Sequence, residues 1–201
     1  MPANLRDRAA PMSLAAPQQT VQVHAGPHAY GAGAKVLHWL VAGLVAAQFA
    51  VAWTMPDIHR GTPQGGLIDL HLSLGAAILL LVALRAALRL GRPGPAAHGG
   101  NVWLRRAARA THLALYALLL ALPLLGWANA SSRGWTVSLF GLLPLPPLMP
   151  AHSPLGPLLG DLHGLAATLL LIGVGLHVTA VAYHQVLLKD RLLQRMLPQP
   201  R

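Results

Sequence analysis

The chain has 201 residues, of which 54% are hydrophobic and only 10% are charged, whereas soluble domains carry about 25% charged residues. It contains no cysteine, which excludes disulfides, thiolate-bound iron–sulfur clusters, covalently attached c-type haem and cysteine nucleophiles. The formal net charge is +10. In a chain so apolar, we attribute this charge to orientation in a membrane rather than to nucleic-acid binding.

Residues 1–34 are rich in Ala, Pro, Gly and Gln and lack the apolar core of a signal peptide, so we expect a flexible N-terminal extension. Four charge-poor stretches follow, each long enough to cross about 30 Å of hydrocarbon as a helix. We expect the spans at about 36–56, 66–88, 110–132 and 162–188. No segment alternates in polarity as transmembrane strands do. The sequence predicts an all-α, four-transmembrane-helix bundle within a membrane domain at 35–198, followed by a tail at 199–201.

The basic residues predict the orientation of this bundle. All of them except Arg60 and Arg133 lie before the first span, around the connection between the second and third spans, or after the fourth span. An even number of spans brings these three places to one side, which the positive-inside rule assigns to the cytoplasm. We therefore expect both termini to be cytoplasmic. The proline-rich connection 133–160 is expected to form an ordered cap at the outer interface.

The chain has 11 histidines, and an imidazole within a bilayer is costly unless it is paired or binds a metal. At a helical rise of 1.5 Å per residue, His71 and His163 lie roughly 3–8 Å below the outer ends of their spans. His38 and His177 lie roughly 24–25 Å below the outer ends of theirs. His163 and His177 project from one face of the fourth span, roughly 21 Å apart. Because haem iron needs axial ligands from facing helices at one level, the two pairs predict two stacked haems.

Two further intramembrane histidines, His112 and His184, are rivals for the inner level. Depth disfavours His184 as a ligand and weakly disfavours His112, so we expect each to contact a propionate, a quinone headgroup or a backbone carbonyl. The remaining histidines lie in expected loops or tails, where a solvated side chain is the favoured interpretation: His24, His28, His59, His98 and His152.

Six segments carry a pattern shared with a known family. They are KVLHWL (35–40), HLSLG (71–75), LRAALRL (84–90), THLALYALLLALPLLGW (111–127), SLFG (138–141) and HGLAATLLLIGVGLHVTAVAYHQVLLKDRLLQRMLP (163–198). On these motifs the chain resembles the bacterial cytochrome b561 proteins, four-helix dihaem b cytochromes of the inner membrane. The resemblance implies that His38 and His177 hold a cytoplasmic-side haem and that His71 and His163 hold a periplasmic-side haem. The family often has a doubled histidine where this chain has Tyr183–His184.

The resemblance also implies electron transfer linked to ubiquinone in the bacterial inner membrane. Some members resemble superoxide oxidases, which pass electrons from superoxide to ubiquinone, and others exchange electrons with a redox partner protein. Two haem b groups, ubiquinone and membrane lipid are the expected cofactors and partners. One alternative is a haem-bearing anchor or electron relay for a partner dehydrogenase or hydrogenase. Another is a histidine-rich metal transporter, which the lack of carboxylates near the midplane disfavours. The oligomeric state is left open, a homodimer included.

Three arginines are candidate anion contacts. Arg85 and Arg89 lie one turn apart on one face of the second span, where arginine suits the haem propionates. Contact with lipid phosphates is the alternative for both residues. Arg133 begins the outer connection and could contact a propionate or attract an anionic substrate such as superoxide. A solvated loop charge is the alternative for Arg133.

Overall fold

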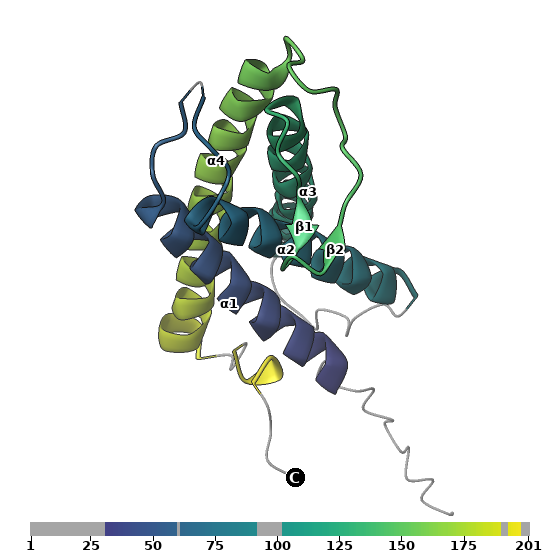
Figure 1. The fold of residues 1–201 in the computed structure, drawn as a ribbon. Helices are drawn as coiled ribbons and strands as arrows, with labels where there is room; N and C mark the ends of the chain where they lie inside the picture. Colours follow the sequence, from purple (N-terminus) through teal and green to yellow (C-terminus); the bar gives the residue numbers. More distant parts are fainter. Residues whose placement is uncertain (1–30, 60, 92–101, 190–192, 198–201) are drawn as a thin grey trace, which may run out of the picture.

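The computed structural model describes residues 31–59, 61–91, 102–189 and 193–197. Within these ranges, four long helices form the bundle of Figure 1. They are α1 (Ala32–Thr54), α2 (Leu67–Gly91), α3 (Val102–Ser132) and α4 (Gly156–Tyr183). Each is long and apolar enough to cross a membrane. The predicted all-α fold with four candidate spans is confirmed. Most of the predicted extension 1–34 and all of the tail 199–201 lie outside the described residues, but α1 already begins within the extension.

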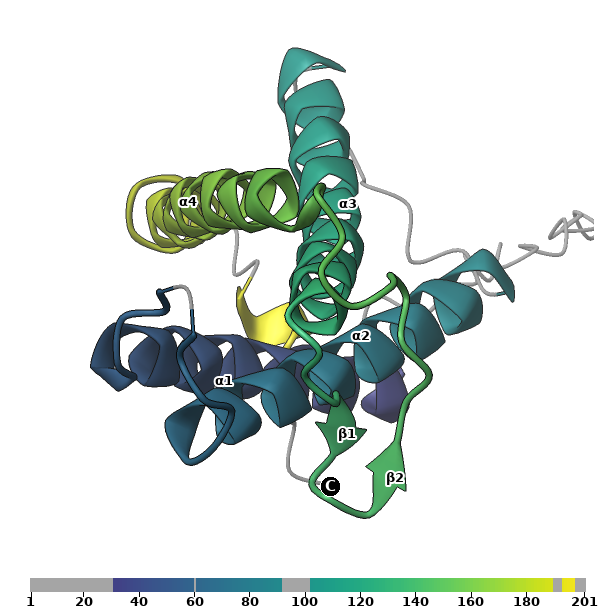
Figure 2. The same cartoon turned by 45° about the horizontal axis from the view of Figure 1, so that its top comes forward.

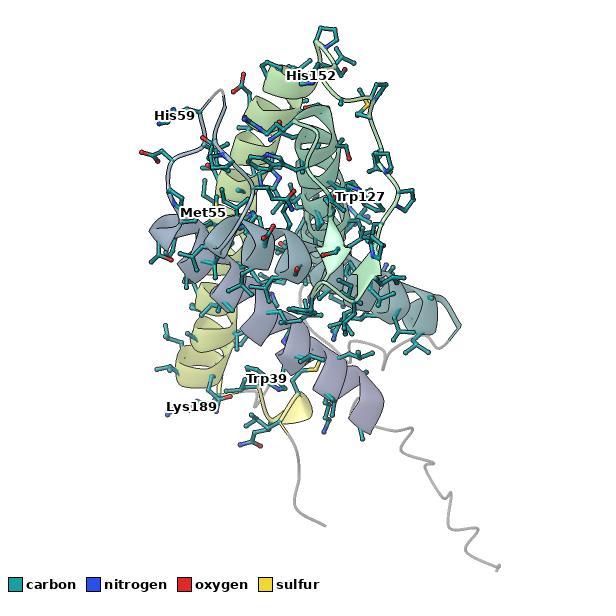
Figure 3. The ribbon with its side chains drawn as sticks, viewed as in Figure 1. Trp39, Met55, His59, Trp127, His152 and Lys189 are labelled. Carbon is teal, nitrogen blue, oxygen red and sulfur yellow. The ribbon has the colours of Figure 1, made fainter. Side chains whose placement is uncertain are left out.

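The two ends of the bundle are distinguished by different side-chain hydrogen bonds. At the end where α1 begins and α4 finishes, which we call the terminal end, Lys35 Nζ donates a hydrogen bond to Leu197 O at 3.0 Å. At the opposite end, which we call the cap end, Arg133 Nη1 donates to His59 O at 3.2 Å. Figure 3 shows His59 at the cap end and Trp39 at the terminal end.

Three helices begin earlier than predicted, and the first of them, α1, begins at Ala32 rather than at about residue 36. The third span was expected from residue 110 and the fourth from residue 162, but α3 begins at Val102 and α4 begins at Gly156. Both predictions stopped at a charged residue, Arg109 or Asp161. Backbone hydrogen bonding continues past such residues, because a helix can extend beyond the apolar stretch that a membrane requires and long side chains can reach the interface.

Local chemistry explains several helix ends. Pro56 follows the end of α1, and a residue that precedes proline is disfavoured in the helical conformation. Gly134 ends α3 with φ of 79°, while its N–H bonds to Ser131 O and the N–H of Trp135 bonds to Ala130 O, the pattern of a Schellman cap. Beyond α4 the chain continues as a π-helical turn, His184–Leu188, and a 3-10 turn, η2 (Leu193–Arg195).

The connection between α3 and α4 is ordered, as predicted. It contains a small antiparallel hairpin of β1 (Ser138–Leu139) and β2 (Leu143–Pro144), which lies beside α2 in Figure 2. Ser73 Oγ donates to Ser138 O at 3.0 Å, and the Gln64 side chain bonds both the N–H and the carbonyl of Thr136. These bonds fix the connection against the start of α2.

The packing of the helices is uneven. α1 packs against α2, α2 against α3, and α3 against α4, whereas α1 and α4 make almost no close backbone contact. The buried cluster of Val41, Ile78 and Val82 joins α1 and α2, and Tyr116 and Leu119 of α3 pack against it. Many large apolar side chains face outward on all four helices, as expected for surfaces in contact with lipid. α1 and α4 are therefore connected mainly through α2 and α3.

Candidate functional site

Two imidazoles face each other near the cap end. His71 of α2 and His163 of α4 have their ring centroids 6.1 Å apart. An imidazole nitrogen lies about 1.2 Å from its ring centroid and about 2.0 Å from a bound metal, so two imidazoles on opposite sides of one metal have centroids roughly 6.4 Å apart. The pair predicted from helical depth is thus brought together at a spacing suited to one metal ion between the rings.

The surroundings of His163 hold its ring in place. Its Nδ1 lies 3.0 Å from the carbonyl oxygen of Leu122 on α3, an interaction that leaves Nε2 available as a ligand. Gly126, one helical turn further along α3, gives the ring room to approach. A Cβ added at Gly126 would lie 2.8 Å from His163 Cε1 and 2.9 Å from Nδ1. Glycine at this position is therefore required by the position of the imidazole.

A cavity adjoins the His71–His163 pair. It has a volume of about 190 Å³ between side chains of all four helices, and both histidines line it. A second, smaller hollow of about 30 Å³ is also lined by both histidines, together with Trp127 and Val137. Open space therefore lies next to the imidazole pair.

Polar atoms in these cavities lack partners. His71 Nδ1, Gln48 Oε1 and Trp127 Nε1 are buried and have no hydrogen-bond partner among the described residues. Buried polar groups are normally paired, and each exception calls for an explanation. A ligand with both metal and polar groups would supply partners here. The spacing of the two rings and the orphaned atoms are features that a haem held by His71 and His163 would account for.

A second imidazole pair lies near the terminal end. His38 of α1 and His177 of α4 have ring centroids 6.4 Å apart, again the spacing expected for two ligands of one metal. The predicted pairs therefore share α4, which provides one histidine to each. His112 of α3 lies closer to His177, at 5.4 Å, and its Nδ1 contacts Ala108 O at 2.6 Å. From its depth along α3, His112 was expected slightly below the level of His38 and His177, whereas the structure brings its ring beside that of His177.

Among the described residues, two cations near the terminal-end pair, Arg85 and Lys35, bind neutral groups rather than carboxylates. Arg85 donates through Nε to the Tyr116 hydroxyl at 2.8 Å and through Nη1 to Ala34 O at 2.9 Å. Lys35 is only 8% exposed, and the carbonyl of Leu197 accepts its hydrogen bond. Arg89 lies one turn beyond Arg85 and is exposed. The carboxylates of the described residues all lie toward the cap end: Asp57, Asp69 and Asp161. A buried cation normally has a counter-ion, so an anionic group from a ligand suits this region.

The other two candidate residues, Arg133 and His184, belong to neither imidazole pair. Arg133 follows α3 at the cap end. Its guanidinium lies 5.4 Å from the centre of the Trp135 ring, and its Nε is buried with no hydrogen-bond partner among the described residues. His184 begins the π-helical turn at the terminal end, with its ring 6.1 Å from that of Tyr183. Such turns often occur at functional sites.

Sequence reasoning missed Gln48, Gly126 and Trp127. Gln48 Nε2 lies 3.2 Å from His71 Nε2 and donates to His71 O at 3.1 Å. A lone amide within the first span was the signal that could have identified it, because a polar side chain in a membrane needs a partner. Gly126 and Trp127 carried no such signal, since their roles depend on which part of α3 faces His163.

Known proteins are similar to this chain over most of its length. A family model described as prokaryotic cytochrome b561 matches residues 29–199. The Yersinia pestis protein named probable superoxide oxidase CybB is 32% identical over 169 residues, which cover 82% of this chain and 93% of that protein. Cytochrome b561 homolog 2 of Escherichia coli K12 is 29% identical over 173 residues, covering 85% and 92%. Cytochrome b562 of Cereibacter sphaeroides is 30% identical over 169 residues, covering 80% and 90%. The chain therefore belongs to the prokaryotic cytochrome b561 family of membrane cytochromes, which carry haem b.

Proposed function

We propose that this protein is a dihaem b-type cytochrome that transfers electrons between the two ends of its bundle and exchanges them with ubiquinone. His71 and His163 hold the cap-end haem, and His38 and His177 hold the terminal-end haem. The observation that carries the proposal is the pair of matched imidazole spacings, 6.1 and 6.4 Å, with one histidine of each pair on α4. Two matched pairs sharing one helix are difficult to explain by chance packing.

We further propose that the terminal end faces the cytoplasm of a bacterium and that the helices cross its inner membrane. The basic residues support this orientation. Most of those in the described ranges lie at the terminal end, where α1 and α3 begin and α2 and α4 finish, and cytoplasmic connections are enriched in Lys and Arg. Arg133 lies at the cap end, which would then face the periplasm.

Haem b held by these imidazole pairs would supply one-electron transfer. The protein residues orient and tune this group. The Leu122 carbonyl fixes the His163 ring, and such a bond from the free N–H of a ligating imidazole sets its orientation and basicity. Gln48 donates to the main-chain carbonyl of His71 and so helps to hold this residue in place. At the terminal end, Arg85 offers a guanidinium that suits propionate carboxylates, and it is already held by Tyr116 and Ala34.

Superoxide oxidation with ubiquinone as the acceptor is the specific reaction that we propose. Two superoxide anions would each lose one electron and become oxygen, and the two electrons with two protons would reduce one ubiquinone to ubiquinol. The likeness to a probable superoxide oxidase supports this choice. So does Arg133 at the cap end, whose buried Nε has no hydrogen-bond partner in the part of the chain that the structure describes, since a cation there would attract a small anion.

Purified full-length protein tests the proposal in two steps. A dithionite-reduced minus oxidised spectrum with a haem assay should give two b-type haems per chain. Rapid mixing with superoxide should then reduce the haems, and added ubiquinone should reoxidise them. A protein without haem would refute the whole proposal. Two haems that superoxide does not reduce would leave the cytochrome assignment intact and favour a relay to a partner protein.

A further inference from the structure

The motif that closes the membrane domain, with its Arg-Met-Leu-Pro sequence at 195–198, has no role in the two imidazole pairs. The structure nevertheless places part of it against α1. The 3-10 turn η2 and the two residues after it, Met196 and Leu197, lie beside the start of α1, although about 160 residues separate the two segments along the chain. We call residues 193–197 the C-terminal strap.

Two side chains of α1 bind the main chain of the strap. Lys35 Nζ donates to Leu197 O at 3.0 Å, and Trp39 Nε1 donates to Met196 O at 2.9 Å. Lys35 and Trp39 are four residues apart and so lie on one face of the helix. The acceptors are carbonyls of a folded turn, in which the N–H groups of Met196 and Leu197 bond back to Leu193 O. The strap is therefore bound by α1 at two specific residues, Lys35 and Trp39.

His38 lies between these two positions. The Trp39 and His38 rings meet edge to face, with centroids 5.4 Å apart and an interplanar angle of 66°, within the range of favourable aromatic pairs. The Trp39 ring cannot swing away from His38 without breaking its hydrogen bond to Met196 O. The strap thus acts on the ring that packs directly against a proposed haem ligand.

We infer that the C-terminal strap positions His38 through Trp39, which makes Trp39 a positioning residue for the terminal-end haem. The inference rests on the proposed function, because it assumes that His38 ligates iron. The orientation of an axial imidazole and the bonds around it tune the electronic state and potential of haem iron. Loosening the strap should therefore change the terminal-end haem and leave the cap-end haem unchanged.

Trp39→Phe in the full-length protein is the main test. Phenylalanine keeps an aromatic ring beside His38 but removes the N–H that binds Met196 O. Met196→Pro tests the same link from the other side, because it removes the N–H that bonds to Leu193 O at 2.9 Å and so disrupts the turn. Trp53→Phe is the matched control, since Trp53 lies on the same helix near the cap end and is 71% exposed.

The readouts are the electron paramagnetic resonance signals of the two oxidised haems and their midpoint potentials in a redox titration. The signal that His38→Ala abolishes identifies the terminal-end haem. We expect Trp39→Phe and Met196→Pro each to shift that signal and its midpoint, with two haems retained per chain. The double variant should shift them no further than the larger single change, because both substitutions break one link. Trp53→Phe should shift neither haem.

Two results would overturn the inference while leaving the dihaem assignment intact. One is two unchanged signals in Trp39→Phe. The other is an equal shift of both haems, which would indicate a general loosening of the bundle. If the wild-type protein itself holds no haem at the His38 level, the inference fails together with the proposed function, and the haem count of the wild type distinguishes this case.

Discussion

Replacing Gly126 with alanine should selectively weaken the cap-end haem. The added Cβ would lie 2.8 Å from His163 Cε1 and 2.9 Å from Nδ1, well inside the normal contact distance of about 3.5–4.0 Å between carbon atoms. The His163 ring must therefore move away from α3, which breaks its bond to Leu122 O and misaligns it with His71. Overpacking of this kind costs about 1–3 kcal/mol, which corresponds to roughly 5- to 150-fold weaker haem binding.

Helix propensity makes the opposite prediction for the same substitution. Alanine within a helix is favoured over glycine by about 0.5–1 kcal/mol, so Gly126→Ala would stabilise the protein if the imidazole did not occupy this space. Gly164→Ala provides the matched control, because Gly164 adjoins His163 on α4 but a Cβ there would meet nothing within 4 Å. The assay is haem content per chain, followed by the rate of haem transfer to excess apomyoglobin. Unchanged haem content and transfer rate in Gly126→Ala would refute the reasoning.

Two further substitutions test the polar contacts of each site. Gln48→Leu removes the hydrogen bond to the main-chain carbonyl of His71 and should shift the midpoint potential of the cap-end haem alone, whereas an unchanged redox titration would show that Gln48 does not tune its ligand. Tyr116→Phe removes the acceptor of the Arg85 Nε–H and should lower the free energy of unfolding by about 1–2 kcal/mol. The measurement is the thermal unfolding midpoint, which should be lower than that of Tyr183→Phe, a control at an exposed tyrosine. Equal midpoints in the two tyrosine variants would contradict a stabilising role for the Tyr116–Arg85 bond.

Much of the fold could be read from the sequence, because a membrane requires long apolar helices and the chain shows four of them. The starts of α3 and α4 could not be read in this way. Residues 102–109 include three arginines, so hydropathy alone ends the span at Ala110, although the helix continues to Val102. The ordered connection was predictable from its prolines, but its hydrogen bonds to Ser73 and Gln64 depend on tertiary packing.

The candidate site, like the fold, could be predicted only in part from the sequence. The two histidine pairs follow from depth, since helical rise places residues along the bundle axis with useful accuracy. Depth says nothing about rotation around each helix. It therefore could not show that Gly126 faces His163, that Gln48 faces His71, or that His112 lies beside His177. The contact between Trp39 and the C-terminal strap joins opposite ends of the chain, and no local pattern encodes it.

The most direct test of the account is the haem content of variants of α4, because this helix is proposed to serve both sites. We predict two haems per chain in the wild type, one in His163→Ala, one in His177→Ala, and none in the double variant. The haem that remains in one single variant should differ from the haem that remains in the other in its midpoint potential. Two haems retained in either single variant, or a full loss caused by one of them in a folded protein, would contradict two independent sites that share α4.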